Sequence, residues 1–419
     1  APHLTVEENM TLGLERSRFG IVQSDRAKVR DALTLLGHPD LPLSTPVRKL
    51  NIGLQQVIEI GRALVCDADV IIMDEPTSSL TEADTKSLFR TILRLKDAGI
   101  SVIYISHFLE EVMEIADRFT ALRDGESVGS SDIADTTITE IIELMIGRSL
   151  DEMFPRTAHS FGEAKLTVRG LTGHLLPKQV NLQVRAGEVL GIAGLVGAGR
   201  SEMLRAIFGL DRAREGMMTL DEGTEPIALH TMTPRKALRM GIDFLSEDRK
   251  EEGLATSMTL SENTTLSTLP RFVGLKGMGL INQQEEHAAT SKWIAELRIK
   301  CAGSTQSVSA LSGGNQQKVA LARMLEQDAE VLLLDEATRG IDVGSKVEIY
   351  HLIDQLAQRG KAIIFVSSYL PELFGVCDTI AVMSRGRLSP AQPVGEWTHH
   401  SVMEAATLVH DSSEKVIPA

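Results

Sequence analysis

Three things are scarce in this sequence, and each absence excludes a class of protein. No apolar run approaches the roughly 20 residues that a helix needs to cross a bilayer. The net charge of −14 argues against binding to a nucleic-acid backbone as the main role. Cysteine occurs three times, at Cys66, Cys301 and Cys377, without the spacing of a zinc site or a disulfide framework. We therefore expect reduced cysteines in the core of a cytosolic protein.

The chain does contain an internal repeat with one fixed offset of 261 residues (311 − 50 = 261). The matched landmarks are Leu50-Asn51-Ile52-Gly53 with Leu311-Ser312-Gly313-Gly314, Asp74-Glu75 with Asp335-Glu336, His107 with Ser368, Asp117 with Asp378, and Gly125 with Gly386. Chance does not keep one offset across five separated landmarks, so we predict two copies of one domain. The predicted boundaries are 1–150 for the first domain, 151–164 for a linker without periodicity, and 165–419 for the second domain.

Short apolar, β-branched runs alternate with helical stretches in both copies. The expected buried strands are 70–73 and 101–105 in the first copy and 331–334 and 362–366 in the second, and the expected helices between them are 82–95 and 346–357. This alternation predicts an α/β fold in which a mostly parallel sheet is covered by helices. The second copy opens with alternating segments at 166–170 and 180–184, which predict antiparallel strands.

A glycine-rich loop joins an expected strand at 188–193 to an expected helix at 200–208. This context is typical of a phosphate-binding loop, because backbone N–H groups and the helix N-terminus both attract phosphate oxygens. The residues that we assign to nucleotide binding are Gly194, Gly197, Ala198, Gly199, Arg200 and Ser201. The hydroxyl of Ser201 is also the expected Mg²⁺ ligand. Arg200 stands where the motif has lysine, and the different shape and reach of its guanidinium predict poor hydrolysis.

The matching loop of the first copy would fall before Ala1, since 194 − 261 = −67. We therefore expect the first domain to be incomplete in this sequence and the chain to be truncated at its N-terminus. A consequence is that these 419 residues alone should hydrolyse ATP weakly or not at all.

Each copy has four apolar residues followed by Asp-Glu, at Asp74-Glu75 and Asp335-Glu336. This pattern places Asp74 and Asp335 at the carboxyl end of a parallel strand, where α/β sheets bind ligands and where an aspartate can hold Mg²⁺. The glutamate that follows can polarise the water that attacks the γ-phosphate. A single Asp-Glu pair could equally be a helix N-terminal charge, but two pairs at the same offset favour catalysis.

The end of the next strand carries His107 in the first copy and Ser368 in the second. A histidine at this edge can contact the γ-phosphate and orient the attacking water, whereas serine is a weak substitute. The first copy therefore has the better hydrolytic strand ends, and the second has the only phosphate loop in the sequence.

The stretch Leu311-Ser312-Gly313-Gly314-Asn315-Gln316-Gln317, followed by the apolar run that ends at Asp335-Glu336, resembles the signature of ABC transporter ATPases. The resemblance covers essentially the whole chain. The tandem arrangement, Arg200 in the phosphate loop, and the stretches 246–250 and 335–344 are similar to the duplicated ATPase subunit of monosaccharide importers. This group includes ribose, galactose, xylose and autoinducer-2 systems. The resemblance implies two ABC ATPase domains in tandem, each with antiparallel and helical subdomains.

In that family the two domains close head to tail, so that each ATP lies between one phosphate loop and the other domain's signature. The implied residues of site one are Asp74, Glu75 and His107 with Ser312, Gly313, Gly314 and Asn315, and those of site two are Arg200, Ser201, Asp335 and Glu336 with Asn51, Ile52 and Gly53. The first signature is eroded, because Asn51 replaces serine and Ile52 replaces glycine. We therefore expect site two to be the weaker site.

The resemblance also implies ATP and Mg²⁺ as cofactors and membrane-spanning permease subunits as partners, linked through them to a substrate-binding protein. It implies no nucleic acid, and a peripheral location on the cytoplasmic face of the inner membrane. The expected docking segments are 4–12 and 259–266. Two alternatives remain open from the residues. One is a soluble tandem ATPase acting on ribosomes, which the short, non-basic linker disfavours, and the other is a non-hydrolysing pseudo-ATPase.

Overall fold

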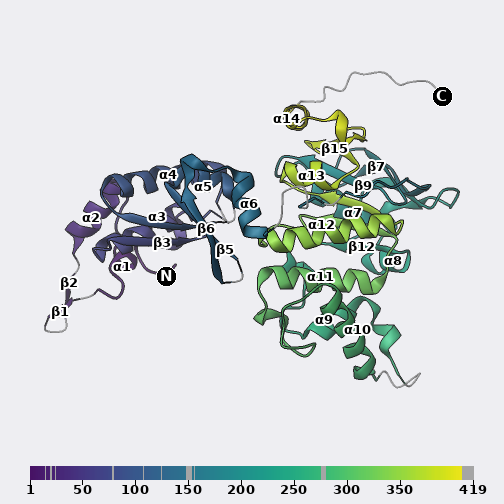
Figure 1. Cartoon of the computed structure of the whole chain (residues 1–419), viewed down its shortest axis with the longest axis horizontal. Helices are drawn as coiled ribbons and strands as arrows, with labels where there is room; N and C mark the ends of the chain where they lie inside the picture. The colour runs from purple at the N-terminus through teal and green to yellow at the C-terminus, as the bar shows by residue number, and fades with distance from the viewer. Residues whose placement is uncertain are drawn as a thin grey trace. The chain divides into compact units, whose positions relative to one another are not determined.

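Figure 1 shows a computed structural model of the whole chain. The structure describes residues 1–14, 16–18, 21–23, 25–77, 80–106, 108–123, 125–147, 153–154, 156–274 and 280–407. The chain divides into two compact units, Ala1–Gly147 and Arg148–Ala419. None of the helices in the described ranges combines the length and apolar character that a membrane-spanning helix requires.

In its described residues, the first unit combines six α-helices with three two-stranded sheets. Its helices are α1 (Val6–Thr11), α2 (Arg26–Leu35), α3 (Ile52–Val65), α4 (Glu82–Asp97), α5 (Leu109–Ile115) and α6 (Ile138–Ile146). Its strands are β1 (Arg16–Arg18), β2 (Ile21–Gln23), β3 (Val70–Asp74), β4 (Ser101–Ile105), β5 (Arg118–Arg123) and β6 (Glu126–Asp132). Strands β3 and β4 are parallel, whereas β1–β2 and β5–β6 are antiparallel pairs.

The second unit contains two larger sheets and a group of helices beside them (Figure 1). A seven-stranded sheet has the order β12-β13-β14-β9-β15-β16, with β17 also paired to β15, and a four-stranded antiparallel sheet has the order β11-β10-β7-β8. The strands are β7 (Ala164–Thr172), β8 (Val180–Arg185), β9 (Val189–Gly194), β10 (Glu215–Leu220), β11 (Ile227–Ala228), β12 (Ile242–Leu245), β13 (Val331–Asp335), β14 (Ala362–Val366), β15 (Thr379–Ser384), β16 (Arg387–Leu388) and β17 (Gln392–Pro393). The helices are α7 (Arg200–Phe208), α8 (Pro234–Arg239), α9 (Leu260–Thr265), α10 (Gln283–Glu296), α11 (Gly313–Gln327), α12 (Val343–Gln358), α13 (Leu370–Val376) and α14 (His399–Thr407).

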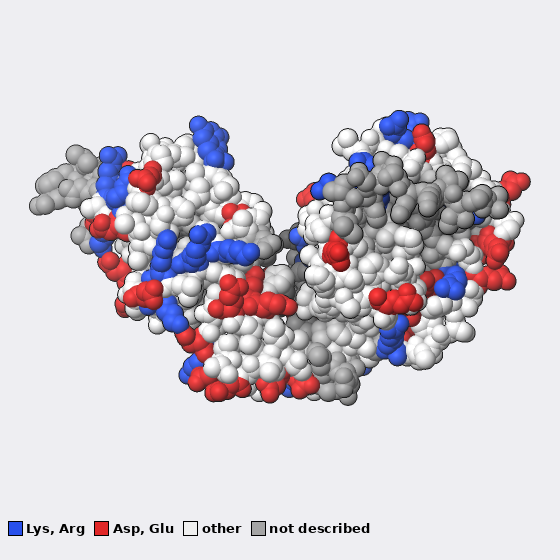
Figure 2. All heavy atoms as spheres, turned by 90° about the horizontal axis from the view of Figure 1, so that it is seen from above, with Lys and Arg blue, Asp and Glu red and all other residues white. Residues whose placement is uncertain are grey.

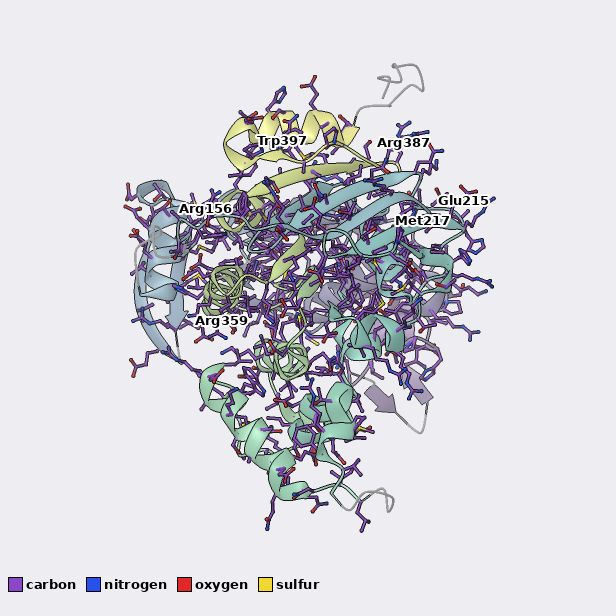
Figure 3. All side chains as sticks on the ribbon, turned by 90° about the vertical axis from the view of Figure 1, so that its right-hand side faces the viewer. Arg156, Glu215, Met217, Arg359, Arg387 and Trp397 are labelled. Carbon is purple, nitrogen blue, oxygen red and sulfur yellow. The ribbon has the colours of Figure 1, made fainter. Side chains whose placement is uncertain are left out.

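The parallel strands of the second unit confirm the expectation of buried apolar runs. Every residue of β13 and β14 is buried, since elements cover both faces of their sheet. The sheet places β9, which leads into the glycine-rich loop, between β14 and β15. The carboxyl ends of β9, β13 and β14 therefore meet at one edge of the sheet, where ligands bind in open α/β folds. Near the amino end of β15, the Trp397 indole N–H donates a 3.1 Å hydrogen bond to the Ile380 carbonyl. This bond connects the residues just before α14 to β15 (Figure 3).

The matching strands of the first unit are buried on one face only, so the prediction of buried strands at 70–73 and 101–105 is wrong for the other face. Ile71 and Met73 face α3 and α4 and are 6% and 5% exposed. Ile72 and Ile103 point the other way and are 66% and 51% exposed. The physical reason is that no described element of this unit covers the second face. In the second unit, residues of β13 and β14 share one apolar core with residues of the antiparallel strands β7 and β8.

The segment 151–164, expected to be a linker, has no helix or strand in its described part before Ala164. Its side chains nevertheless pack on the second unit. The rings of Phe154 and Tyr350 are 5.1 Å apart, and Thr157 hydrogen-bonds the Asp354 carboxylate at 2.9 Å through both its amide and its hydroxyl. Arg156, labelled in Figure 3, lies 3.5 Å from the Asp378 carboxylate. The described residues of this segment are therefore part of the packing of the second unit.

The cysteines correct another expectation. Cys377 is fully buried, but Cys301 is only half-buried and Cys66 is exposed. Cys66 directly follows Val65, the last residue of α3; Val65 belongs to a buried apolar cluster, whereas Cys66 lies at the helix end and is exposed.

On the face shown in Figure 2, acidic and basic side chains lie in small groups close to one another.

Candidate nucleotide site

The glycine-rich loop of the second unit lies between β9 and α7 and has the backbone that a phosphate cradle needs. Gly194, Gly197 and Gly199 have φ of +150°, +77° and +107°, values that favour glycine. A Cβ at Gly194 would lie 2.4 Å from the Met383 carbonyl oxygen, so the sheet itself excludes a side chain there. Helix α7 begins after Gly199 without any side-chain cap. Its first N–H groups are thus available to an anion, and Ala198 adds an amide to the same turn.

Arg200 is buried and points towards the strand ends. Its guanidinium donates a 2.9 Å hydrogen bond to the Ser367 carbonyl and lies 3.4 Å from the Glu336 carboxylate. Glu336 also accepts a 3.1 Å hydrogen bond from the Ser368 hydroxyl. Burial raises the pKa of Glu336, and the nearby charge of Arg200 opposes that rise. The cation of the phosphate loop is therefore engaged with the candidate catalytic carboxylate.

Asp335 ends β13 and is 1% exposed. Burial raises the pKa of its carboxyl to about 6, against an ordinary value of 3.8, although a hydrogen bond with Ser201 and the charge of Arg200 oppose the shift. Its Oδ1 atom has no hydrogen-bond partner among the described residues. A buried carboxylate oxygen beside a hydroxyl is a donor set that suits a hard divalent cation. Among the described residues, no group of three His, Cys, Asp or Glu side chains could hold a metal alone.

A cavity of about 550 Å³ opens in front of these residues. Its lining residues are Ser201, Arg205, Ser246, Glu247, Asp248, Arg249, Glu252, Asp335, Arg339 and Gly340. A volume of this size accommodates a nucleotide-sized ligand. Two ion pairs hold the segment that begins at Ser246: Glu247 pairs with Arg339, and Glu252 pairs with Arg205. Sequence reasoning identified the segment but missed these partners, which lie far away in the chain.

The signature of the second unit forms the start of α11. Ser312 is the N-terminal cap residue, yet its side chain does not cap the helix. Its hydroxyl instead accepts a 2.8 Å hydrogen bond from the side-chain amide (Nδ2) of Asn315. A Cβ at Gly313 would lie 2.8 Å from the Arg249 guanidinium, and one at Gly314 would lie 2.7 Å from the Ser345 hydroxyl. The two glycines therefore let α11 approach its neighbours closely, and the N–H groups at its start remain uncapped by side chains.

The first unit reproduces the strand ends of the second in backbone detail. Glu75 and Glu336 both adopt the left-handed conformation, with φ of +44° and +47°. Their amides donate 2.9 Å hydrogen bonds to the carbonyls of Ile105 and Val366. Asp74 and Glu75 are exposed, in contrast to Asp335 and Glu336. His107 lies outside the described residues.

The eroded signature of the first unit starts α3. Here Asn51 is the cap, and its side-chain oxygen accepts a 2.9 Å hydrogen bond from the Leu54 amide. A Cβ at Gly53 would lie 2.8 Å from the Asp84 carboxylate, which matches the close approach at Gly314. The Asn51 side chain caps one N–H group at the start of α3, whereas the Ser312 side chain caps none at the start of α11. The start of α3 is therefore less able to bind a phosphate than the start of α11.

Comparison with known proteins identifies the family. The family model described as ABC transporter matches residues 1–78 and 177–339, which is more than half of the chain. The ribose import ATP-binding protein of Chromobacterium violaceum is 41% identical over 418 residues, which are 99% of this chain and 82% of that protein. This chain belongs to the ribose-import type of ABC transporter ATP-binding proteins.

Two further relatives agree with this membership. A ribose import ATP-binding protein of Rubrobacter xylanophilus is 43% identical over 408 residues, covering 97% of this chain and 80% of the relative. A putative ribose/galactose/methyl galactoside import ATP-binding protein of Agrobacterium fabrum is 42% identical over 410 residues, with coverage of 97% and 80%. The ABC ATPase fold and the tandem arrangement predicted from the repeat are thereby confirmed.

Both units of this ABC protein also contain a short helix at the predicted docking segments. Helices α1 and α9 each begin with a capping box, formed by Thr5 with Glu8 and by Thr259 with Glu262. The asparagine that follows in each is buried and donates from its side chain to the cap residue's carbonyl, at 3.0 Å and 2.9 Å. The two segments therefore share one local structure, although the offset between them is 254 residues (259 − 5 = 254).

Proposed function

We propose that this protein is the ATP-hydrolysing subunit that drives uptake of ribose or a closely related monosaccharide. The observation that carries the proposal is sequence similarity over 97–99% of the chain to ribose-import proteins from several bacteria. The phosphate loop, the Asp-Glu strand end and the signature helix supply the parts that ATP hydrolysis requires. The relatives favour transport over action on ribosomes.

At the phosphate loop of the second unit, the amides from Gly194 to Ser201 are positioned to hold the β- and γ-phosphates. Mg²⁺ would be held by the Ser201 hydroxyl and the Asp335 carboxylate, and when bound it would neutralise phosphate charge. Glu336 is the candidate base that polarises water. Its carboxylate is engaged by Arg200 at 3.4 Å, and an ion pair makes a carboxylate a weaker base, so we expect slow hydrolysis here.

We further propose that ATP binds between the two units, with each phosphate loop facing the other unit's signature. The site that uses Ser312, Gly313, Gly314 and Asn315 would then draw on Asp74, Glu75 and His107 for hydrolysis. The site that uses the loop at 194–201 would meet the α3 signature, in which Asn51 caps its own helix. This arrangement makes the two sites unequal.

The partners follow from the same proposal. Membrane-spanning permease subunits would dock against α1 and α9, and a substrate-binding protein would act through them. The protein would then lie on the cytoplasmic face of the inner membrane and contact the bilayer only through these partners. Closure of the units on ATP would move the docking helices and rock the permease.

A reconstitution experiment tests the proposed function. A form of the protein extended at its N-terminus to the length of its relatives, so that the first unit also has a phosphate loop, is combined in proteoliposomes with the permease and binding protein encoded beside it. ATP turnover is then measured with and without ribose, galactose and xylose. We expect at least one of these sugars to stimulate Mg²⁺-dependent turnover together with its uptake. The proposal is wrong if none of the sugars stimulates turnover, or if the protein co-sediments with ribosomes and not with membranes.

A further inference from the structure

A buried glutamate joins two loops at the strand ends of the second unit. Glu372 lies on α13 and is 1% exposed. One of its carboxylate oxygens accepts hydrogen bonds from the Thr338 hydroxyl at 2.6 Å and from the Ser367 hydroxyl at 2.9 Å. Thr338 belongs to the turn after β13, and Ser367 follows β14 directly. A single carboxylate oxygen therefore connects the ends of two neighbouring parallel strands.

The first unit contains the same arrangement at the same offset of 261 residues (372 − 111 = 261). Glu111 lies on α5, and one of its oxygens accepts hydrogen bonds from the Thr77 hydroxyl at 2.9 Å and the Ser106 hydroxyl at 3.1 Å. In both copies the serine hydroxyl also accepts a 3.0 Å hydrogen bond from the amide two residues later, that of Phe108 or Tyr369. The repeat thus preserves both the carboxylate and the shape of the loop that it holds.

The remaining partner of the carboxylate differs between the copies. In the first unit the same oxygen of Glu111 accepts a 2.6 Å hydrogen bond from the Tyr104 hydroxyl. In the second unit the other oxygen of Glu372 pairs with Lys346 at 3.1 Å, and position 365, which matches Tyr104, is phenylalanine. A carboxylate in the protein interior needs several donors to offset its desolvation, and different side chains supply them here. Only the bonds to threonine and serine are common to both copies.

The two loops that this carboxylate joins carry the candidate catalytic groups. Thr338 follows Glu336 by two residues, and Ser367 directly precedes Ser368. The Ser368 hydroxyl in turn donates to the Glu336 carboxylate at 3.1 Å, so the connection forms a closed ring through both loops. We propose that Glu111 and Glu372 are positioning residues, which fix the distance between the catalytic glutamate and the residue at the end of the next strand. This proposal rests on the proposed ATPase function.

The physical argument is one of rigidity. Catalytic groups must be held close to their productive geometry, and misplacement by about 1 Å can lower turnover about 100-fold. Glu75 and Glu336 lie in turns whose left-handed backbone is intrinsically unfavourable for glutamate, so these turns need support from their surroundings. A carboxylate that accepts charge-assisted hydrogen bonds from both loops supplies that support. The glutamine side chain has the same shape but only one acceptor oxygen and no charge, so it tests the charge with little change in packing.

Hydrogen exchange of the full chain tests the clamp without any need for ATP turnover. We expect Glu372→Gln to accelerate amide exchange about tenfold or more at 336–340 and 367–370 together, because hydrogen bonds to charged groups are among the stronger ones. Exchange in the first unit should not change. Glu111→Gln should give the reverse pattern, so each variant is the control for the other. Unchanged exchange in both loops, or a uniform increase throughout a unit, would overturn the clamp.

Turnover in the assembled importer tests whether the clamp positions catalytic groups. We expect Glu111→Gln to lower kcat about tenfold or more while KM for ATP stays within about twofold and Tm changes little. The matched control is Glu110→Gln, which removes an exposed charge from the same helix and should leave kcat unchanged. An unaltered kcat for Glu111→Gln would contradict the positioning role. A lower kcat accompanied by a changed KM and a lower Tm would show that Glu111 only stabilises the fold. Absence of wild-type turnover would contradict the proposed function, while the exchange experiment would still decide the clamp.

Discussion

The buried carboxyl of Asp335 destabilises the second unit when it is ionised, so replacing this carboxyl with a neutral group should stabilise the unit. Burial raises the pKa of Asp335 from 3.8 to about 6. The folded state therefore binds more protons than the unfolded state between these pH values, and stability falls as pH rises from 3.8 through about 6. The shift of about 2 units corresponds to a loss of about 3 kcal/mol above this window.

Asp335→Asn removes this ionisation at the same side-chain volume. We expect it to stabilise the second unit at pH 7.5 by about 1 to 3 kcal/mol, the lower value applying if the new amide N–H finds no acceptor. A gain of this size corresponds to a Tm increase of a few degrees. The gain should shrink as the pH is lowered towards 4, because the wild-type carboxyl then becomes neutral in both states. Thermal and urea unfolding at pH 7.5 and pH 4.5 measure both effects.

Asp243 on β12 provides a matched control. It is 4% exposed, burial raises its pKa to about 6 as well, and its Oδ2 atom has no hydrogen-bond partner among the described residues. Asp243→Asn should therefore give a similar pH-dependent gain. Only Asp335→Asn should also abolish the stabilisation that Mg²⁺-ATP confers, since Asp243 does not line the cavity. A destabilising Asp335→Asn, or a gain that is independent of pH, would refute the reasoning.

Three further predictions concern the buried cation, the uncovered sheet face and the unequal sites. Arg200→Ala should destabilise the second unit by about 3 kcal/mol in urea unfolding, because it leaves Glu336 buried without its cation; a change below about 0.5 kcal/mol would contradict the ion pair. Ile72→Thr should reduce aggregation and the binding of hydrophobic dyes, and should change the free energy of unfolding by no more than about 0.5 kcal/mol. Ile71 is one residue away but only 6% exposed, so Ile71→Thr should lower the free energy of unfolding by about 2 kcal/mol or more. Equal effects of the two substitutions would show that both faces are covered. In the importer assembled with the N-terminally extended, full-length protein, Glu75→Gln should remove most ATP turnover and Glu336→Gln much less, and equal losses would refute the asymmetry.

The sequence allowed the parallel strands and the phosphate loop to be predicted because each depends on a short, local pattern. The run at 331–334 is apolar throughout, and the glycines at 194–199 follow a strand directly. The uncovered face of β3 and β4 could not be predicted in the same way. An apolar run looks the same whether one face or both faces of the strand are covered, and coverage depends on elements distant in the chain.

The site was predicted in its residues but not in its internal contacts. Arg200 was identified as a departure from the motif, yet its ion pair with Glu336 depends on the approach of the start of α7 to the end of β13, and the two residues are 136 positions apart in sequence (336 − 200 = 136). Glu111 and Glu372 gave no signal, because acidic residues near the start of a helix are usually solvated charges that favour the helix dipole. Their function becomes visible only when the hydroxyls from two different strand ends are seen to converge on them.

A practical consequence for dissecting the protein follows from the contacts that Phe154, Arg156, His159 and Phe161 make with the second unit. A shortened version that began at Lys165, where the repeat suggests a boundary, would uncover the Tyr350 ring and leave the Asp378 carboxylate without Arg156 and His159. It would also remove the Phe161 ring from beneath the Arg185 guanidinium, which lies 4.7 Å from the ring centre. An autonomous second half should therefore start no later than Phe154.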